Sequence, residues 1–252
     1  MARKDGRDAR APREVAITAG FHRLSEGSCL YRAGGTVVLA TASIDSGVPA
    51  FLEGKGTGWL TAEYQMHPRS NPNRREARDG RGKAPSGRTQ EIQRLIGRAL
   101  RSAVYLDRLG VRTVTVDCDV LEADGGTRTA SVTAGFVALA LGLAKLHARG
   151  DLAVPVLRDP VASISVGHVG GELLLDLAYT EDSKARVDLN LVATAKGAII
   201  EVQGTAEGQA VPRADMDAMV DLGLEGVFSL CRVQVEALRA ASVDLATLVA
   251  PS

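Results

Sequence analysis

Residues 111–131 read VRTVTVDCDVLEADGGTRTAS, and the character of this stretch changes twice along its length. Residues 111–121 alternate apolar and polar side chains, which predicts a half-buried strand. Two glycines follow, and the chain then enters an apolar run that predicts a helix over about 129–148, ended by Gly150. The stretch therefore predicts a strand, a glycine turn and the N-terminus of a helix.

This succession is typical of an anion-binding site. Free backbone N–H groups point outward from a helix N-terminus, and glycines let an oxyanion approach the main chain. Thr127, Thr129 and Ser131 could add hydroxyl donors, or one of them could cap the helix, and Arg128 adds a planar cation that suits phosphate. The spacing fits neither a P-loop nor a Rossmann fingerprint. An ordinary glycine turn with an N-cap is the alternative, and Arg128 favours phosphate.

Strands and helices are predicted in separate clusters along the rest of the chain. Three hairpins are expected, around Gly34-Gly35 (residues 28–44), Gly170-Gly171 (161–180) and Lys196-Gly197 (186–207). Further helices are expected from Arg88 to a stop at Gly110, and over about 213–240. This grouping predicts a mixed α+β fold rather than an α/β fold in which parallel strands alternate strictly with helices.

A long segment, roughly 45–87, is rich in Gly, Pro, Asn and Arg and predicts a loop. A loop of that length inside a compact chain is usually functional or mobile. No Pro/Ser-rich linker divides the 252 residues, so a single domain over residues 1–252 is expected.

Charge is unevenly placed although the formal net charge is zero. Residues 69–101 carry nine Arg and one Lys against three acids, whereas residues 151–252 carry fifteen acids against seven bases. Such a concentrated arginine zone suggests a local site for a polyanion, and a solvated, salt-bridged surface is the alternative. Aromatic residues make up only 4%, so contact with a nucleic acid should rest on charge more than on stacking.

Other features bear on the compartment. The N-terminal stretch MARKDGRDARAPRE has no apolar core, which argues against a secretory signal. The apolar run at 134–144 is too short to span a bilayer, so no membrane is expected as a partner. Three widely separated cysteines indicate reduced thiols at small core positions in a cytoplasmic protein.

Two more groups of polar residues could complete a phosphate site. Arg88 follows Ser86-Gly87 at a predicted helix start and could share one phosphate with Arg128 if the fold brings the two together; an ordinary surface arginine is the alternative. Asp182 and Asp188 flank a short polar turn before an apolar strand. Paired carboxylates beside a phosphate site suit Mg²⁺, whereas an ordinary acidic turn is the alternative.

Six ordered blocks of this sequence resemble ribonuclease PH, the phosphorolytic exoribonuclease related to polynucleotide phosphorylase and to the exosome ring subunits. The blocks are EGSCLYRAGGTVVLATAS, GWLTAEYQMHPRS, SGRTQEIQRLIGRALR, DCDVLEADGGTRTAS, DLAYTEDSKARVDLNLV and IIEVQGTAEG. The resemblance implies an α+β fold built from βαβ units and a homohexameric ring made of three dimers. It also implies an enzyme that uses inorganic phosphate to trim the 3′ ends of tRNA precursors and releases nucleoside diphosphates.

The resemblance assigns roles to individual residues as well. It implies that Arg88, Gly126, Thr127 and Arg128 bind the attacking phosphate, that Asp182 and Asp188 carry Mg²⁺, and that RNA is gripped by Arg69, Arg74, Arg75 and Arg78. A non-catalytic RNA-binding ring subunit of the same fold is the alternative function. The presence of both arginines and both aspartates of the reaction centre favours the enzyme.

Overall fold

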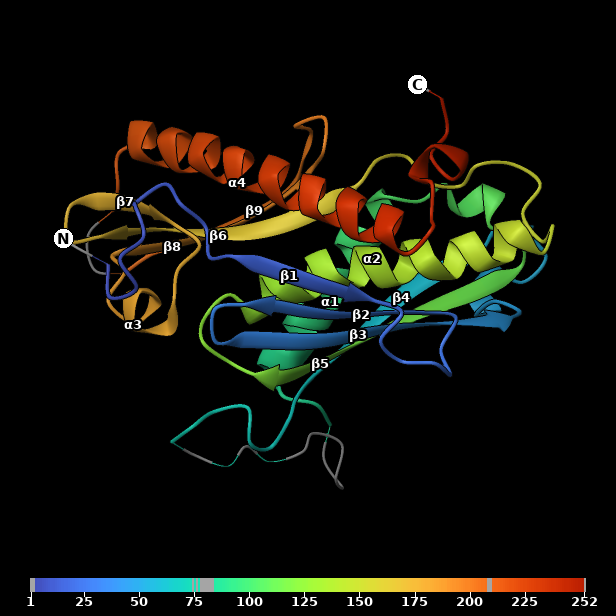
Figure 1. Ribbon diagram of the computed structural model, residues 1–252, viewed down its shortest axis with the longest axis horizontal. Coiled ribbons are helices and arrows are strands. Elements are labelled where there is room, and N and C mark those ends of the chain that lie inside the picture. The colour runs from blue at the N-terminus through green and yellow to red at the C-terminus, as the bar shows by residue number, and fades with distance from the viewer. Residues whose placement is uncertain (1–2, 74, 76, 78–83, 208–209, 252) are drawn as a thin grey trace.

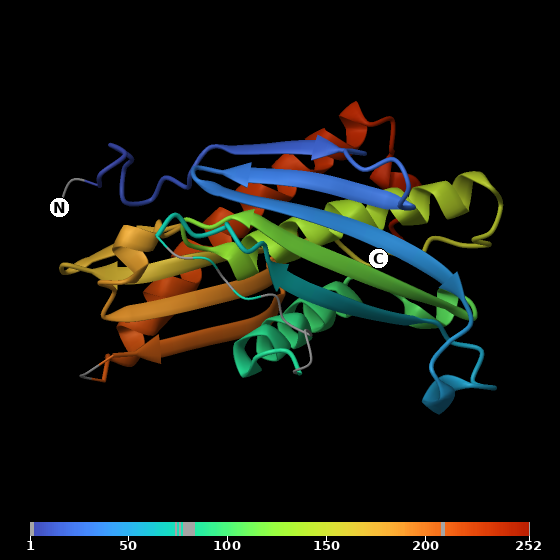
Figure 2. The ribbon, with the colours of Figure 1, turned by 90° about the horizontal axis from the view of Figure 1, so that it is seen from below.

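The computed structural model describes residues 3–73, 75, 77, 84–207 and 210–251. Two β-sheets lie next to each other, with helices between and over them (Figures 1 and 2). The first sheet has the order β1-β2-β3-β5-β4, and its strands are β1 (Val15–Ala19), β2 (Gly27–Ala33), β3 (Thr36–Ser46), β5 (Arg112–Glu122) and β4 (Trp59–Met66). The mixed α+β prediction is confirmed.

The first sheet contains a strand that the sequence did not reveal. The hairpin around Gly34-Gly35 forms as expected, with Ala33 paired to Thr36. The prediction of a loop over residues 45–87 is wrong for β4, which pairs in parallel with β5. Parallel strands need a long crossover connection, and helix α1 (Gly87–Ser102) lies on it. Strand β4, helix α1 and strand β5 therefore form a βαβ unit.

Helix α1 begins where its sequence caps it. The Ser86 side chain accepts a hydrogen bond from the Thr89 N–H (3.1 Å), and the apolar residues at three- and four-residue spacing are buried. The helix ends at Ser102 rather than near Gly110, because the backbone of the next residues forms hydrogen bonds with another part of the chain. The Tyr105 N–H donates to the Val156 carbonyl at 2.8 Å.

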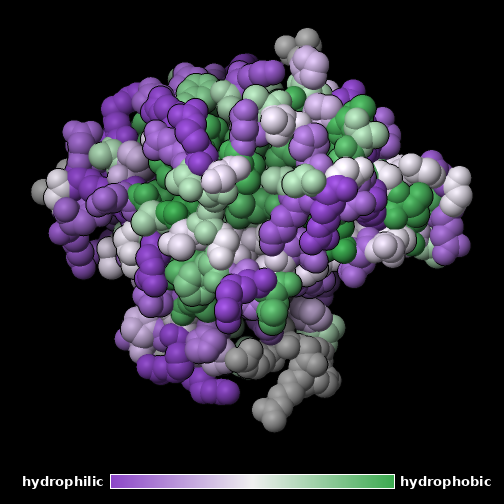
Figure 3. Space-filling model, turned by 45° about the vertical axis from the view of Figure 1, so that its right-hand side comes forward, coloured by the Kyte–Doolittle hydropathy of each residue, from purple (hydrophilic) through white to green (hydrophobic). Residues whose placement is uncertain are grey.

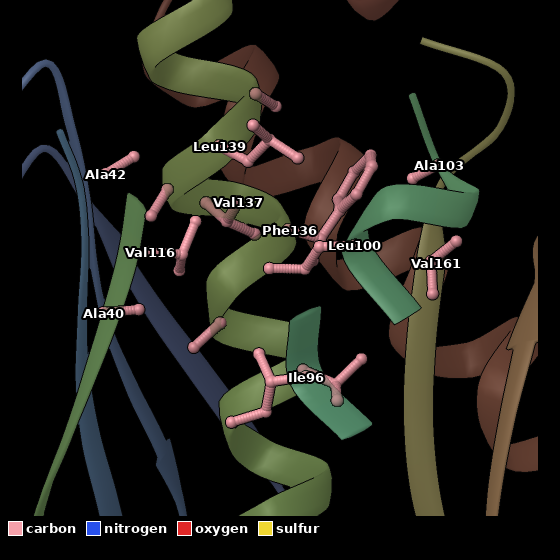
Figure 4. Close-up of a cluster of buried hydrophobic side chains, with 14 of the residues drawn as sticks. Ala40, Ala42, Ile96, Leu100, Ala103, Val116, Phe136, Val137, Leu139 and Val161 are labelled. Atoms are coloured by element: carbon pink, nitrogen blue, oxygen red, sulfur yellow. The ribbon is translucent and has the colours of Figure 1, made fainter. Parts of the chain in front are cut away.

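Helix α2 (Thr127–Ala148) lies between the two sheets and starts two residues earlier than predicted. Figure 4 shows Phe136, Val137 and Leu139 of this helix among side chains of the first sheet, α1 and β6. A helix enclosed on several sides needs apolar residues all round, and each fully buried Leu or Phe contributes about 1.5–3 kcal/mol. By length and composition α2 could cross a membrane, but 89% of its most apolar window is buried inside the protein.

The second sheet has the order β7-β6-β8-β9 and is covered by the long helix α4. This helix spans Arg213–Ala240, the range predicted for it. Its strands are β6 (Val161–Val169), β7 (Glu172–Leu175), β8 (Val187–Thr194) and β9 (Ile199–Ala206). The strand predicted over 172–180 ends at Leu175, because Asp176 adopts a left-handed φ of 56° and the short helix α3 (Tyr179–Asp182) follows. Both predicted hairpins of this half are otherwise confirmed.

Most apolar side chains are buried, but a few large ones are exposed. All three cysteines are free and buried, as expected of small core residues. Several large hydrophobic side chains are exposed on loops at the end of the first sheet where β5 begins, namely Phe21, Leu24, Phe51 and Val111. Figure 3 brings that end forward and shows hydrophobic patches between hydrophilic side chains. The glycine turn lies at the opposite end of β5.

Candidate active site

The glycine turn presents backbone N–H groups at the start of α2. Gly125 and Gly126 have φ of 78° and 64°, a left-handed conformation that glycine adopts without strain. Gly126 is the N-cap of α2 and no side chain caps this helix. The N–H groups of the first helical residues have no partner within the helix, so they are available to an anion.

The turn also packs tightly against the chain that leads to α3. A Cβ atom on Gly125 would lie 2.5 Å from the carbonyl oxygen of Leu177 and 2.8 Å from the Tyr179 nitrogen. Only glycine fits this approach. As a result the turn lies beside the segment that ends in Asp182.

The hydroxyl groups that follow the turn bind the protein itself. The Thr127 hydroxyl shares a buried 2.9 Å hydrogen bond with the Tyr64 hydroxyl. Those of Thr129 and Ser131 donate to the carbonyls of Gly126 (2.9 Å) and Thr127 (2.8 Å). The expectation that Thr129 and Ser131 add free donors, or that one hydroxyl caps the helix, is therefore wrong. The donors that remain for an anion are the backbone N–H groups at the start of α2, including that of Thr127.

Two arginines occupy equivalent places, each the second residue of a helix. The Arg128 guanidinium lies 3.3 Å from Gln203 Oε1 on β9 and 3.5 Å from Glu91 Oε1 on α1, and the Arg88 side chain is exposed. Burial raises the pKa of the Tyr64 hydroxyl, while its bond with Thr127 and the charges of Arg88 and Arg128 lower it. Both guanidinium groups thus lie close enough to Tyr64 to affect it, and the fold brings the two helix N-termini together.

Two carboxylates lie close enough to the arginines to interact with them electrostatically. Asp182 ends α3, and Asp188 is the second residue of β8. Burial raises the pKa of both carboxyl groups, and the charge of Asp182 raises that of Asp188 further. The positive charges of Arg128 and Arg88 oppose these increases at both aspartates. The two arginines and two aspartates predicted from the sequence therefore share one electrostatic environment.

The carboxylate pair fits a magnesium ion. Mg²⁺ takes oxygen ligands and commonly binds one or two carboxylates together with substrate phosphates. Within the described part of the chain, the Asp182 carboxylate makes no hydrogen bond or ion pair, and Asp188 accepts one hydrogen bond from Asn190 (3.2 Å). No group of three or more potential metal ligands occurs among those residues either, so an ion here would depend on substrate and water for its remaining ligands.

Three residues of the site were not singled out from the sequence. Tyr64 lies on β4, the unpredicted strand. Gln203 reaches Arg128 only because β9 pairs with β8 and lies near α1. Glu91 had a local signal, since it follows Arg88 by three residues and so shares its side of α1.

Part of the predicted RNA contact lies next to the turn. The Ser70 carbonyl accepts a hydrogen bond from the Ala123 N–H at 2.9 Å, and Ala123 directly precedes the glycine turn. The exposed Arg69, which precedes Ser70 in the chain, therefore lies near the turn. Arg75 is also exposed. Arg74 and Arg78, the other two predicted contacts, lie outside the described residues.

The fold and the site together define a mixed α+β protein with an uncapped helix N-terminus, two arginines and two carboxylates in one place. Residues 11–142 match the first domain of the 3′ exoribonuclease family, and residues 159–226 match its second domain. The chain belongs to the 3′ exoribonuclease family.

Solved structures share the whole fold at low sequence identity. Rice (Oryza sativa) Rrp46 is 18% identical with a TM-score of 0.75, over 94% of this chain and 100% of that one. A chain of the Archaeoglobus fulgidus exosome, solved with RNA bound to the active site, is 24% identical with a TM-score of 0.74, over 91% of each chain. A chain of an archaeal exosome core is 22% identical with a TM-score of 0.71, over 92% of this chain and 90% of that one.

Proposed function

We propose that the protein is a phosphorolytic 3′→5′ exoribonuclease that trims the 3′ ends of tRNA precursors. The observation that carries this proposal is the uncapped N-terminus of α2, which lies with Arg128 and Arg88 beside the carboxylates of Asp182 and Asp188. Family membership supports exoribonuclease chemistry, and the anion site supports phosphate as the attacking group.

In the proposed reaction, an oxygen of inorganic phosphate forms a bond to the phosphorus of the last phosphodiester. The bond from that phosphorus to the 3′ oxygen of the preceding nucleotide breaks, and this oxygen leaves and takes up a proton. The products are a nucleoside diphosphate and RNA shortened by one residue. Two anions must meet, so the N–H groups and arginines hold the attacking phosphate and reduce the repulsion. Positioning the reactants can contribute about 7–11 kcal/mol.

Asp182 and Asp188 are proposed to hold Mg²⁺. When bound, the ion neutralises negative charge on the phosphates. The positive charges of Arg128 and Arg88 favour the ionised form of both carboxylates, and Asn190 donates a hydrogen bond to the Asp188 carboxylate.

A ring of six copies is proposed as the assembly. A closed ring of dimers needs two separate contact surfaces on each copy. The exposed apolar residues at the far end of the first sheet supply one candidate surface. A second lies on β9 and α4, where Ile199, Val202 and Phe228 are exposed.

The discriminating experiment is incubation with a 3′-extended tRNA precursor, with and without inorganic phosphate. Phosphate-dependent release of nucleoside diphosphates is expected. Tight RNA binding without release would favour a non-catalytic ring subunit instead. Release of monophosphates independent of phosphate would mean hydrolysis and would contradict both functions.

Neutralising Arg69 and Arg75 together should weaken RNA binding in a salt-dependent manner. Each phosphate contact on a single strand contributes about 0.7 to the slope of log affinity against log salt, so the double variant should lose about 1.4. Filter binding or fluorescence anisotropy at several salt concentrations measures this. An unchanged slope would show that neither arginine touches the RNA backbone.

A further inference from the structure

A buried arginine holds the glycine turn from behind. Arg13 is 6% exposed, and its Nε and Nη2 donate to the two carboxylate oxygens of Asp176 at 2.9 and 2.6 Å. Its third nitrogen, Nη1, donates to the carbonyl of Asp124 at 2.7 Å. Asp124 is the residue that enters the glycine turn. One side chain therefore connects the turn to Asp176, which is 163 residues away from Arg13 in the chain.

Thr36 holds the same turn through its hydroxyl group. The fully buried hydroxyl accepts the Asp124 N–H at 3.0 Å and donates to the Gly125 carbonyl at 2.7 Å. In a trans peptide the C=O and the next N–H point in opposite directions. With the carbonyls of Asp124 and Gly125 turned toward Arg13 and Thr36, the N–H groups of Gly125 and Gly126 must point the other way. Arg13 and Thr36 thus fix the direction of the anion-binding donors.

Asp176 carries this constraint to the other half of the site. It is buried in a left-handed conformation, and its N–H donates to the Ser165 carbonyl at 2.7 Å. Arg3 donates to the Asp176 carbonyl (2.9 Å) and forms a bidentate pair with Glu181 (2.8 and 2.7 Å), the residue before Asp182. The segment that carries Asp182 is therefore fastened by Arg3 to Asp176, the residue whose carboxylate binds Arg13.

We propose that Arg13 and Thr36 are positioning residues for the reaction: they keep the glycine turn in the form that binds phosphate, and Arg13, through Asp176, fixes the turn relative to Asp182. Neither side chain needs to touch a substrate. The inference rests on the proposed function, since it assigns these residues to the phosphate side of that site. It predicts an effect on phosphate without an equal effect on RNA.

The direct test compares Thr36→Val with Thr36→Ser. Valine keeps the branched shape but frees both the Gly125 carbonyl and the Asp124 N–H. The KM for inorganic phosphate should therefore rise by about 10- to 100-fold, the worth of two hydrogen bonds. The KM for RNA should stay unchanged, and serine, which restores the hydroxyl, should restore most of the phosphate affinity. Protection from thermal unfolding by inorganic phosphate gives the same comparison without turnover.

Arg13→Lys tests the coupling to Asp182. Lysine keeps the charge but lacks the planar fork, so it cannot bond Asp176 through two nitrogens and the Asp124 carbonyl through a third. Both the phosphate KM and kcat should change. Arg10→Ala is the matched control, because Arg10 lies in the same N-terminal segment but forms an exposed ion pair with Glu225. Its kinetics should equal those of the wild type.

The outcomes separate this inference from the proposed function. If the wild type binds phosphate but does not cleave RNA, the proposed function is contradicted. The phosphate-binding constants of the Thr36 variants would still test the role of Thr36 in that case. Equal phosphate affinity in the wild type and Thr36→Val would overturn the inference alone. A wild type without affinity for phosphate would overturn both.

Discussion

Arg128→Ala is expected to reduce phosphorolysis by about 10³-fold while leaving RNA affinity nearly unchanged. Removing one preorganised donor to a developing oxyanion typically costs about 10²–10³ in kcat, and Arg128 also carries a full charge. Its guanidinium lies at the start of α2, between Glu91 and Gln203, and not on the exposed arginine stretch proposed to grip RNA. The substitution should therefore weaken the use of phosphate and not the binding of RNA.

Two measurements check this expectation. Initial rates at several phosphate concentrations give the effect on turnover, and anisotropy with labelled RNA in the absence of phosphate gives the RNA affinity. Arg149→Ala is the matched control, because it removes the same charge just beyond the opposite end of α2. Stability should change little, since the Glu91 partner is 47% exposed and such pairs contribute about 0–1 kcal/mol. A parallel loss of RNA affinity would mean that Arg128 holds the RNA instead.

The elements that the sequence predicted well are those specified by local chemistry. The turns around Gly34-Gly35, Gly170-Gly171 and Lys196-Gly197 need residues that tolerate positive φ, and all three hairpins form around them. Helix α4 matches its predicted range because its apolar spacing is set within the helix itself. The glycine turn before α2 was visible for the same reason.

The elements that were missed depend on distant partners. Strand β4 lies in a segment rich in glycine and proline, and it is a strand because β5 offers a parallel neighbour. The burial of the N-terminal arginines has no local signal in the sequence. In the structure Arg3 and Arg13 are buried, because Glu181 and Asp176 from the second half of the chain supply matching carboxylates. No spacing rule links residues so far apart.

The convergence of Arg88, Arg128, Asp182 and Asp188 lies between these two cases. Each of these residues lies where the local sequence predicts either a helix start or a polar turn beside a strand. Their proximity required the turn at Gly125 to pack against residues 177–179, which is a consequence of the tertiary fold. The sequence could therefore identify these residues as candidates, whereas only the structure could show that they share one electrostatic environment.

Asp188→Asn is expected to abolish magnesium-dependent phosphorolysis and yet to stabilise the metal-free protein. Burial and the charge of Asp182 raise the pKa of the Asp188 carboxyl above its ordinary 3.8. The folded state then binds more protons than the unfolded state between 3.8 and the raised value, so stability falls as pH increases through that window and stays lower at neutral pH. Asparagine removes this charge but can still accept the hydrogen bond from Asn190.

The melting temperature of the metal-free variant should therefore exceed that of the wild type by a few degrees at neutral pH, and the difference should vanish in acid. Added Mg²⁺ should stabilise the wild type more than the variant. Activity should fall by more than about 100-fold, since even the outer partners of metal ligands are typically worth 10–100-fold in affinity or activity. Asp221→Asn, on the exposed side of α4, is the control and should change none of these readouts. A variant that lost activity but gained as much stability from Mg²⁺ as the wild type would show that Asp188 serves the reaction without holding the ion.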